Sequence, residues 1–451
     1  MAPHFANGIP THLLMWQRVR QYAVPPSMIE TATARRAAGD WAGACAAARI
    51  DVDLDLRAVR HRHGTDLTTR LRADLRALAP DLLRWHMPRI APDGHLRPGL
   101  TISLAQYGSP AAGPPPHLVV RTPPAWADAG QRISLTLWEG ARGPRPTHPH
   151  PHPRPDRHHR LDLHRHLWDA GRSGELARRA EPDRAAEAEL LLRAEGCGPR
   201  GAFTVRNGVR GRTGYELVAP DDSHAPRLRP LADALAPQVV AALPVLPDAA
   251  ARTLPDLELL RAGLVTADRL HPLVAAALAP LGAAPPADDA APAEAADPHR
   301  VECRGEIHRI ALRDGVLTAV DHDPEQLRRE DLLVALGGPP LPCLRAIDAA
   351  HRSPEALPAV RERLGHGDVV GALAVVEGLL GPAAVLRDGP LREELESAAD
   401  RRVDHGLFRA GLVAEHPAAH TRERPRAGRG TPPDLFRKQG LRTRPRAALT
   451  G

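Results

Sequence analysis

The pattern Gly-Asp-x-x-Gly-Ala occurs twice in this chain, once near each end, at 39–44 and at 367–372. Each copy lies between two stretches rich in alanine and aliphatic residues, a composition that favours helices. The first glycine can end one helix because it accepts a left-handed conformation, and the aspartate after it can cap the next helix. The pattern therefore predicts two helical hairpins and constrains the chain to a helix-rich fold.

The remaining elements follow from the periodicity of the apolar residues. Leu67, Leu71, Leu75 and Leu78 recur at helical spacing, which predicts a helix over 65–78 with these four leucines buried on one face. Apolar residues that alternate with polar ones predict strands instead. We expect helices at 27–49, 164–195 and 228–279, strands at 100–104, 118–120 and 133–137, a hairpin around 203–218, and a second hairpin of 301–312 with 316–320 across a turn at Asp314-Gly315.

The expected fold class is α+β and predominantly α-helical, with helical hairpins, a small antiparallel sheet, and disordered Pro-rich linkers and tail. A chain of 451 residues is too long for one ordinary core. Changes in composition along the chain suggest where it divides. The expected regions are an N-terminal helical region at 1–92, a small β region at 93–141, a His/Pro/Arg-rich linker at 142–163, a mainly helical middle region at 164–280, an Ala/Pro/Asp linker at 281–299, a hairpin plus helical region at 300–420, and a basic tail at 421–451.

The charge of the chain is concentrated at its C-terminal end. The tail at 421–451 has a net charge of +7, whereas the rest of the chain has a net charge of −1. The arginines from Arg422 to Arg446 could follow nucleic-acid phosphates, but Phe436 is the only aromatic residue beside them on which a base could stack. We therefore expect nucleic-acid binding, if it occurs, to be electrostatic and weak.

The sequence also indicates a cytoplasmic protein. Its four cysteines form no Cys-x-x-Cys pair, which fits a reducing compartment better than a disulfide framework. Met15 is an alternative start, because residues 1–14 have no periodicity. We find no apolar stretch long enough to span a bilayer, and we expect no contact with membranes.

The histidine-rich stretch at 148–166 carries the most conspicuous potential metal ligands. His148, His150, His152, His158 and His159 are the candidates, because imidazole binds zinc, nickel and copper. Prolines between them favour an extended backbone rather than a fixed tetrahedral cage. We therefore expect a solvated linker with no stoichiometric metal, and no cofactor elsewhere.

A second group of candidates follows the predicted hairpin at 301–320. His308, Asp321, His322 and Asp323 could form a site that combines histidine and carboxylate groups, as general acid–base chemistry requires. The alternative is a solvated turn before Pro324. The sequence contains no phosphate-binding loop and no Gly-x-Ser-x-Gly nucleophile motif, which argues against the enzymes that these motifs identify.

Two classes of function remain open. The first is a non-enzymatic scaffold or adaptor in the cytoplasm of an organism with a GC-rich genome, which binds another protein through helical-hairpin surfaces. The second is an enzyme with a histidine and carboxylate site near 302–325. An ordered cleft that joins the four candidate residues there favours the enzyme, whereas a helical surface without such a cluster favours the scaffold.

Overall fold

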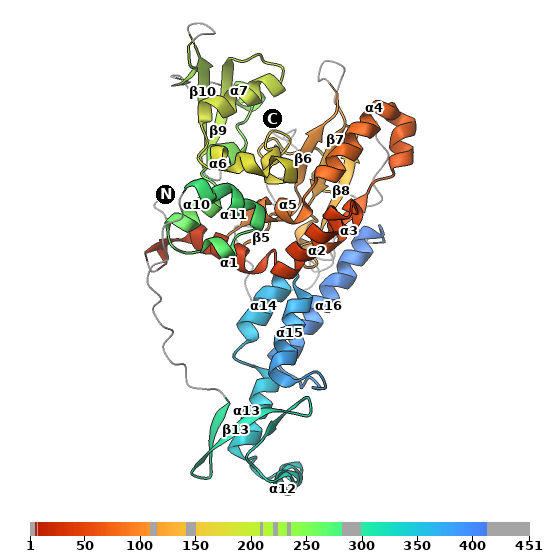
Figure 1. Ribbon diagram of the computed structural model, residues 1–451, viewed down its shortest axis with the longest axis vertical. Helices are drawn as coiled ribbons and strands as arrows, with labels where there is room; N and C mark the ends of the chain where they lie inside the picture. The colour runs from red at the N-terminus through yellow and green to blue at the C-terminus, as the bar shows by residue number, and fades with distance from the viewer. Residues whose placement is uncertain are drawn as a thin grey trace, which may run out of the picture.

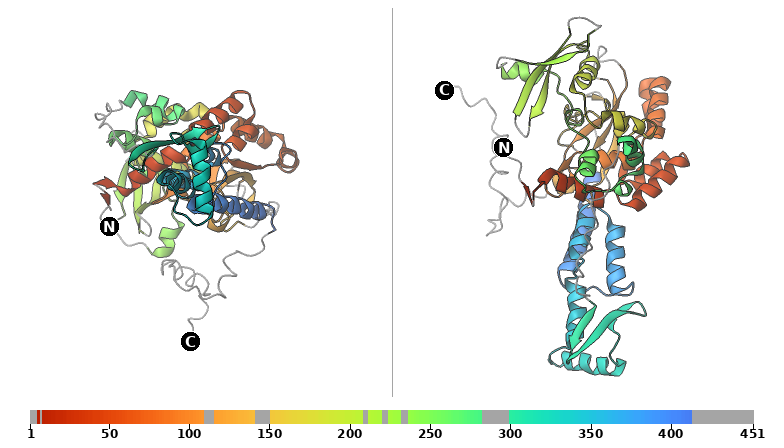
Figure 2. Two further views of the ribbon diagram at one scale, coloured as in Figure 1. Left: turned by 90° about the horizontal axis from the view of Figure 1, so that it is seen from below. Right: turned by 60° about the vertical axis from the view of Figure 1, so that its left-hand side comes forward.

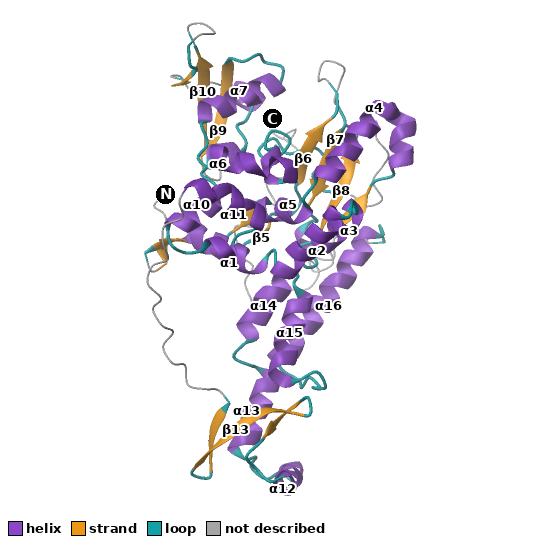
Figure 3. Ribbon diagram, viewed as in Figure 1, coloured by secondary structure: helices purple, strands orange, loops and turns teal. Residues whose placement is uncertain are grey.

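The computed structural model describes residues 5–6, 8–108, 115–140, 150–207, 211–219, 224–231, 236–281 and 299–412. These residues form a helix-rich α+β protein, as predicted (Figure 3). Their buried apolar side chains divide into three separate cores. We call the parts around these cores the body, the middle unit and the C-terminal unit, the last comprising residues 299–412.

The body is built on a mixed four-stranded sheet. Three of its strands are antiparallel neighbours, as predicted, and the additional strand β3 pairs in parallel with β8. Leucine, isoleucine and valine side chains of all four strands enter the largest core. In sheet order, the strands are β3 (Ile50–Asp53), β8 (Ile133–Trp138), β7 (His117–Arg121) and β6 (Thr101–Gln106).

Helices cover this sheet, and the predicted leucine stripe is confirmed. Leu67, Leu71, Leu75 and Leu78 are all buried. Gly64 has a left-handed φ of 80°, which breaks α4 just before the stripe begins. The α-helices of the body are α1 (Thr11–Tyr22), α2 (Pro26–Ala37), α3 (Trp41–Ala47), α4 (Leu56–Ala77), α5 (Pro80–His86), α6 (Leu176–Arg179), α10 (Pro255–Arg261) and α11 (Pro272–Leu278).

The shorter elements of the body are strand pairs and 3-10 turns. In the first part of the helix predicted at 164–195, the chain forms short 3-10 turns instead of one continuous helix. These elements are β1 (Phe5–Ala6), β2 (Ile9–Pro10), β4 (Arg89–Ile90), β5 (His95–Leu96), η2 (Ala125–Ala127), η4 (Arg165–Leu167), η5 (Ala170–Glu175), η6 (Ala267–Arg269) and η7 (Ala279–Leu281).

The middle unit packs short helices against a three-stranded antiparallel sheet. Phe203 and Leu217 from this sheet join Leu191, Leu192 and Leu246 in a small core. Residues 227–230, at the start of a predicted helical region, form the edge strand instead. The elements are α7 (Arg184–Ala194), β9 (Gly201–Asn207), β10 (Gly211–Val218), β11 (Arg227–Pro230), α8 (Pro237–Ala242) and α9 (Asp248–Ala251).

The C-terminal unit extends away from the body, with β13 and α12 at its far end (Figures 1 and 2). The strand predicted at 301–312 is two strands, because Arg304 and Gly305 both take left-handed φ values and turn the chain between them. The elements are β12 (Arg300–Cys303), β13 (Glu306–Arg313), β14 (Val316–Ala319), α12 (Pro324–Ala335), α13 (Pro342–Arg352), α14 (Leu357–Gly365), α15 (Val369–Leu380) and α16 (Pro390–Arg409).

Both predicted Gly-Asp turns are present, between α2 and α3 and between α14 and α15. Gly39 and Gly367 have φ values of 76° and 84°, and each ends a helix. The Asp40 carboxylate accepts a hydrogen bond from the Gly43 N–H at 2.8 Å, and the Asp368 carboxylate caps α15 in the same way. An arginine five residues earlier, Arg35 or Arg363, pairs with the capping aspartate in each turn.

The C-terminal unit contacts the body at two places. At the second Gly-Asp turn, the Arg49 guanidinium donates a hydrogen bond to the His366 carbonyl oxygen at 2.8 Å. At the end of α16, the Arg409 guanidinium pairs with the Asp53 carboxylate of β3 at 2.6 Å. These contacts orient α14, α15 and α16 so that their unit projects from the body.

The region predicted as a His/Pro/Arg-rich linker differs from that expectation where the structure describes it, at 150–163. The Asp156 and Asp162 N–H groups donate to the Thr101 and Ser103 carbonyl oxygens of β6 at 2.8 and 2.9 Å. Since β6 is the edge strand of the sheet, these bonds satisfy backbone groups that the sheet leaves unpaired. The segment is thus held along the body.

Two other predicted segments cannot be compared with the structure. Most of the Ala/Pro/Asp linker at 281–299 and the whole basic tail at 421–451 lie outside the described residues. Among the helices that are described, none is both long enough and apolar enough to cross a membrane.

Candidate functional site

Two of the four residues predicted near 302–325 lie together at the far end of the C-terminal unit. The imidazole rings of His308 and His322 stack with centroids 4.2 Å apart and an interplanar angle of 12°. The group of possible ligands around His322 consists of two cysteines, Cys303 and Cys343, rather than the predicted carboxylates. The site therefore combines thiol and imidazole groups.

The turn at Arg304 and Gly305 places Cys303 and His308 on one face of the sheet. Cys303 ends β12 and pairs with Glu306, while His308 pairs with Val301 two positions further along the same strands. Because side chains alternate across a strand, Cys303, Val301 and His308 share a face. This face packs against α13, which carries Cys343 in its first turn.

His322 reaches the cysteines from the segment between β14 and α12. One potential ligand atom from each of Cys303, His322 and Cys343 lies within 4.8 Å of the others. Both cysteines are fully buried and His322 is 7% exposed. Three segments that are distant in the sequence thus converge on one buried point.

The hydrogen bonding of this cluster is incomplete. His308 Nδ1 and His322 Nε2 are buried and have no hydrogen-bond partner among the described residues. A buried nitrogen without a partner costs free energy, so such atoms call for an explanation. Burial, followed by the hydrogen bond to Cys303, raises the pKa of Cys343 to about 11. Without a further positive charge, this thiol is protonated at neutral pH and is a poor nucleophile.

The two predicted aspartates have other contacts. The Asp321 carboxylate pairs with the Arg309 guanidinium at 2.9 Å, and this bond, with that from the Arg309 backbone N–H, lowers the pKa of Asp321 to about 2. Asp323 caps α12, where its carboxylate accepts from the Glu325 N–H at 3.4 Å. The structure therefore brings the two histidines together without placing these carboxylates at hydrogen-bonding distance from them.

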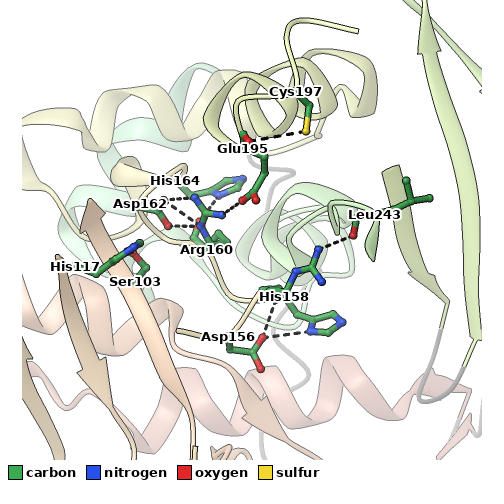
Figure 4. A network of polar contacts seen from close by, with 11 residues as sticks. Ser103, His117, Asp156, His158, Arg160, Asp162, His164, Glu195, Cys197 and Leu243 are labelled. Carbon is green, nitrogen blue, oxygen red and sulfur yellow. Dashed lines mark hydrogen bonds and ion pairs between the residues drawn. The ribbon is translucent and has the colours of Figure 1, made fainter. Parts of the chain in front are cut away.

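The histidines of the 148–166 stretch do not gather in the same way. His150 is buried, its Nε2 donates to the Thr122 carbonyl oxygen at 3.0 Å, and its Nδ1 accepts from the His152 backbone N–H at 3.1 Å. His158 bonds Asp156 (Figure 4). His152 is exposed and His159 is half-buried, while His148 lies outside the described residues.

Figure 4 shows what fixes this stretch in place. The Arg160 guanidinium bonds the Asp162 carboxylate at 2.7 Å and also pairs with Glu195 of the middle unit. Among the described residues, the side chains that lie close enough together to bind one metal ion are Cys303, His322 and Cys343. The part of the histidine-rich stretch that the structure describes is thus held by ion pairs.

Sequence reasoning predicted the histidines of the site and missed its cysteines. Cys303 and Cys343 are far apart in the sequence and do not have the short spacing of a Cys-x-x-Cys motif. Two local signals could have indicated them. Cys303 directly precedes an Arg-Gly turn, and Cys343 follows Pro342 at a helix start, and both are places where chain direction changes.

Comparison with known proteins identifies no relative of this chain. It matches no model of a protein family, no curated protein and no solved structure.

Proposed function

We propose that the protein is a non-enzymatic adaptor, and that it binds another protein through an exposed apolar surface on α12 of the C-terminal unit. The observation that carries the proposal is the exposure of consecutive apolar residues at the end of this helix. Leu332, Leu333 and Leu336 are 65%, 52% and 84% exposed, and Val334 between them is 37% exposed. Such a continuous apolar patch on a water-soluble surface marks an interaction site more often than isolated apolar residues do.

The shape of the molecule supports a role for α12 in contact with a partner. The structure describes α12 in full, and none of its side chains is buried. Helix α12 lies at the end of the C-terminal unit that is farthest from the body (Figure 1). A partner can therefore reach it without meeting the helices that cover the main sheet.

The polar residues of α12 favour a protein partner of defined orientation. Glu325, Arg328, Arg329 and Glu330 precede the apolar patch on the same helix. An apolar centre with charged residues at its margin is the usual organisation of a protein interface. The free state of all four cysteines, each within the described residues, supports a reducing compartment such as the cytoplasm as the place of this interaction.

Affinity capture tests the proposal when three forms of the full chain are compared in the source organism. The first is the wild type, and the second is the L332E/L336E variant, which introduces two charges into the apolar patch. The third is the V370E/L373E variant, which alters exposed apolar residues at the second helical hairpin (79% and 41% exposed). Because all four positions are exposed, both variants should fold like the wild type.

We expect one protein to be captured in stoichiometric amount by the wild type and by V370E/L373E. Its recovery should fall at least tenfold with L332E/L336E, because a charge buried at an interface costs more than the ~1.4 kcal/mol that corresponds to tenfold. The purified partner should show the same difference in a direct binding assay. Loss of the partner with V370E/L373E alone would instead place the interface on the Gly-Asp hairpin and contradict a role for α12.

A further inference from the structure

We propose that Cys303, Cys343 and His322 bind one zinc ion, which is structural and holds the far end of the C-terminal unit together. The inference goes beyond the adaptor function and does not depend on it. It rests on the convergence of three potential ligand atoms within 4.8 Å and on the buried His322 Nε2, which has no partner among the described residues.

The spacing of the groups suits a tetrahedral zinc site. With Zn–S distances of about 2.3 Å and Zn–N distances of about 2.0–2.1 Å, ligand atoms around one zinc ion lie roughly 3–4 Å apart. The Cys303, His322 and Cys343 atoms meet within a slightly larger limit, so small side-chain movements complete the arrangement. Thiolate combined with imidazole selects zinc over magnesium and calcium, which prefer oxygen ligands.

The charges of the site also favour a zinc ion. Each cysteine releases its proton to solvent when it binds the metal, and the two thiolates then balance the two positive charges of Zn²⁺. A buried site that is neutral overall avoids the cost of an unpaired charge in a low-dielectric interior. The bound ion also takes a lone pair from His322 Nε2, which otherwise has no partner among the described residues.

His308 lies beside this site and is not one of its ligands. Its ring stacks on that of His322 with centroids 4.2 Å apart, so a zinc ion in the plane of the His322 ring lies outside the plane of the His308 ring. Its second ring nitrogen, Nε2, lies 3.7 Å from the carboxylate of the exposed Glu306, which can hold the ring in one orientation. Stacked on His322, His308 can fix the orientation of the imidazole that binds the ion.

Burial supports a structural role over a catalytic one. Cys303 and Cys343 have no exposed surface, so a substrate has no path to a metal bound between them in this conformation. The ion would connect the end of β12, the segment between β14 and α12, and the start of α13. It would therefore fix the direction in which α12 leaves the sheet.

Metal analysis of the full chain tests the assignment. The chain is purified without a tag under reducing conditions, dialysed, and analysed for zinc by mass spectrometry. We expect about one zinc ion per chain in the wild type and in C197S, the control that removes an exposed cysteine elsewhere. C303S, C343S and H322Q should each lose the zinc. H308Q alters a neighbour of the site and should weaken zinc binding by no more than roughly 10–100-fold.

Cobalt provides a measurement that needs no variant. Co²⁺ added to the zinc-free wild-type chain should give the visible absorption of a tetrahedral site together with thiolate charge-transfer bands. A wild-type chain that binds neither zinc nor cobalt, or that binds cobalt without thiolate bands, contradicts the proposal. A disulfide between Cys303 and Cys343 in protein purified under reducing conditions would contradict the proposal as well. Zinc that remains in C303S but is lost when His152 and His158 are replaced would assign the metal to the histidine-rich stretch instead.

Discussion

Gly367 lies so close to Gly130 that a Cβ atom added to Gly367 would be 2.1 Å from the Gly130 carbonyl oxygen. The second Gly-Asp turn is therefore in backbone contact with the body, and only glycine permits the approach. Gly39 has the same place in the first turn and a similar φ of 76°, but a Cβ atom added there would meet nothing within 4 Å. The two turns share a conformation and differ in their surroundings.

Alanine substitution should therefore be more harmful at Gly367 than at Gly39. We expect G39A to lower the free energy of unfolding by about 1–2 kcal/mol, the cost of left-handed backbone for an L-residue. G367A should lower it further, because the contact with Gly130 must also open. The control G378A, at an exposed helical glycine with open space around it, should be neutral or stabilise by about 0.5–1 kcal/mol. Equal losses for G39A and G367A in urea denaturation would contradict the contact.

Loss of the capping aspartate should also lower the free energy of unfolding more in the second Gly-Asp turn than in the first. D40A removes a cap whose side chain is 41% exposed, and we expect a loss of about 0.5–2 kcal/mol in the free energy of unfolding. Asp368 is 6% exposed and also lies beside the Arg49 and Arg363 guanidiniums, at 3.8 and 2.8 Å. D368A leaves these cations without their carboxylate, so it should cost more than D40A. A smaller loss for D368A than for D40A in the same denaturation series would argue against this junction.

Leu71 provides a test of the main core. It has no exposed surface, and we expect L71A to lower the free energy of unfolding by about 2–5 kcal/mol, because the substitution leaves a cavity among well-packed neighbours. The matched control is L336A, in which the same atoms are removed from a leucine that is 84% exposed. The control should change stability by less than about 0.5 kcal/mol. A loss below that value for L71A would contradict its assignment to the core.

Acid should weaken the fold through buried histidines that stay neutral. Burial lowers the pKa of His150 from its usual 6.5 to about 4, and it does the same for His86. Between these pH values the unfolded chain takes up protons that the folded chain does not, so stability is present near neutral pH and is lost as pH falls from about 6.5 to about 4.

The pH dependence of unfolding measures this contribution. One histidine contributes a slope of at most about 1.4 kcal/mol per pH unit in that range. We therefore expect the difference in unfolding free energy between pH 6.5 and pH 4.5 to be smaller in H150Q than in the wild type. H152Q, which replaces an exposed histidine nearby, is the control and should keep the wild-type difference. An unchanged difference in H150Q would show that His150 is protonated in the folded chain.

The features that the sequence predicted depend on local chemistry. The Gly-Asp turns follow from the preferences of glycine and aspartate at helix ends, and the burial of Leu71 and its neighbours follows from helical spacing. The parallel pairing of β3 with β8 depends on a contact between residues far apart in the chain. No periodicity within 50–53 could reveal that partner.

The site was predictable in part for the same reason. His308 and His322 belong to one hairpin and the segment after it, so their proximity follows from local structure. Cys343 joins them only because α13 packs back against the sheet, which is a matter of tertiary structure. The turn that positions Cys303 was hidden inside an apparently continuous strand at 301–312.

Position-specific photo-crosslinking tests the adaptor function most directly. A photoreactive residue is placed at Leu336, directly after α12, or at Val403 on α16, which is 62% exposed and serves as the control. Both full-length forms are then irradiated in the source organism. We predict one dominant protein adduct at position 336, the same protein that L332E/L336E fails to capture, and no such adduct at position 403. The same adducts at both positions, or none at position 336, would contradict the proposal that α12 is the surface through which this protein binds its partner.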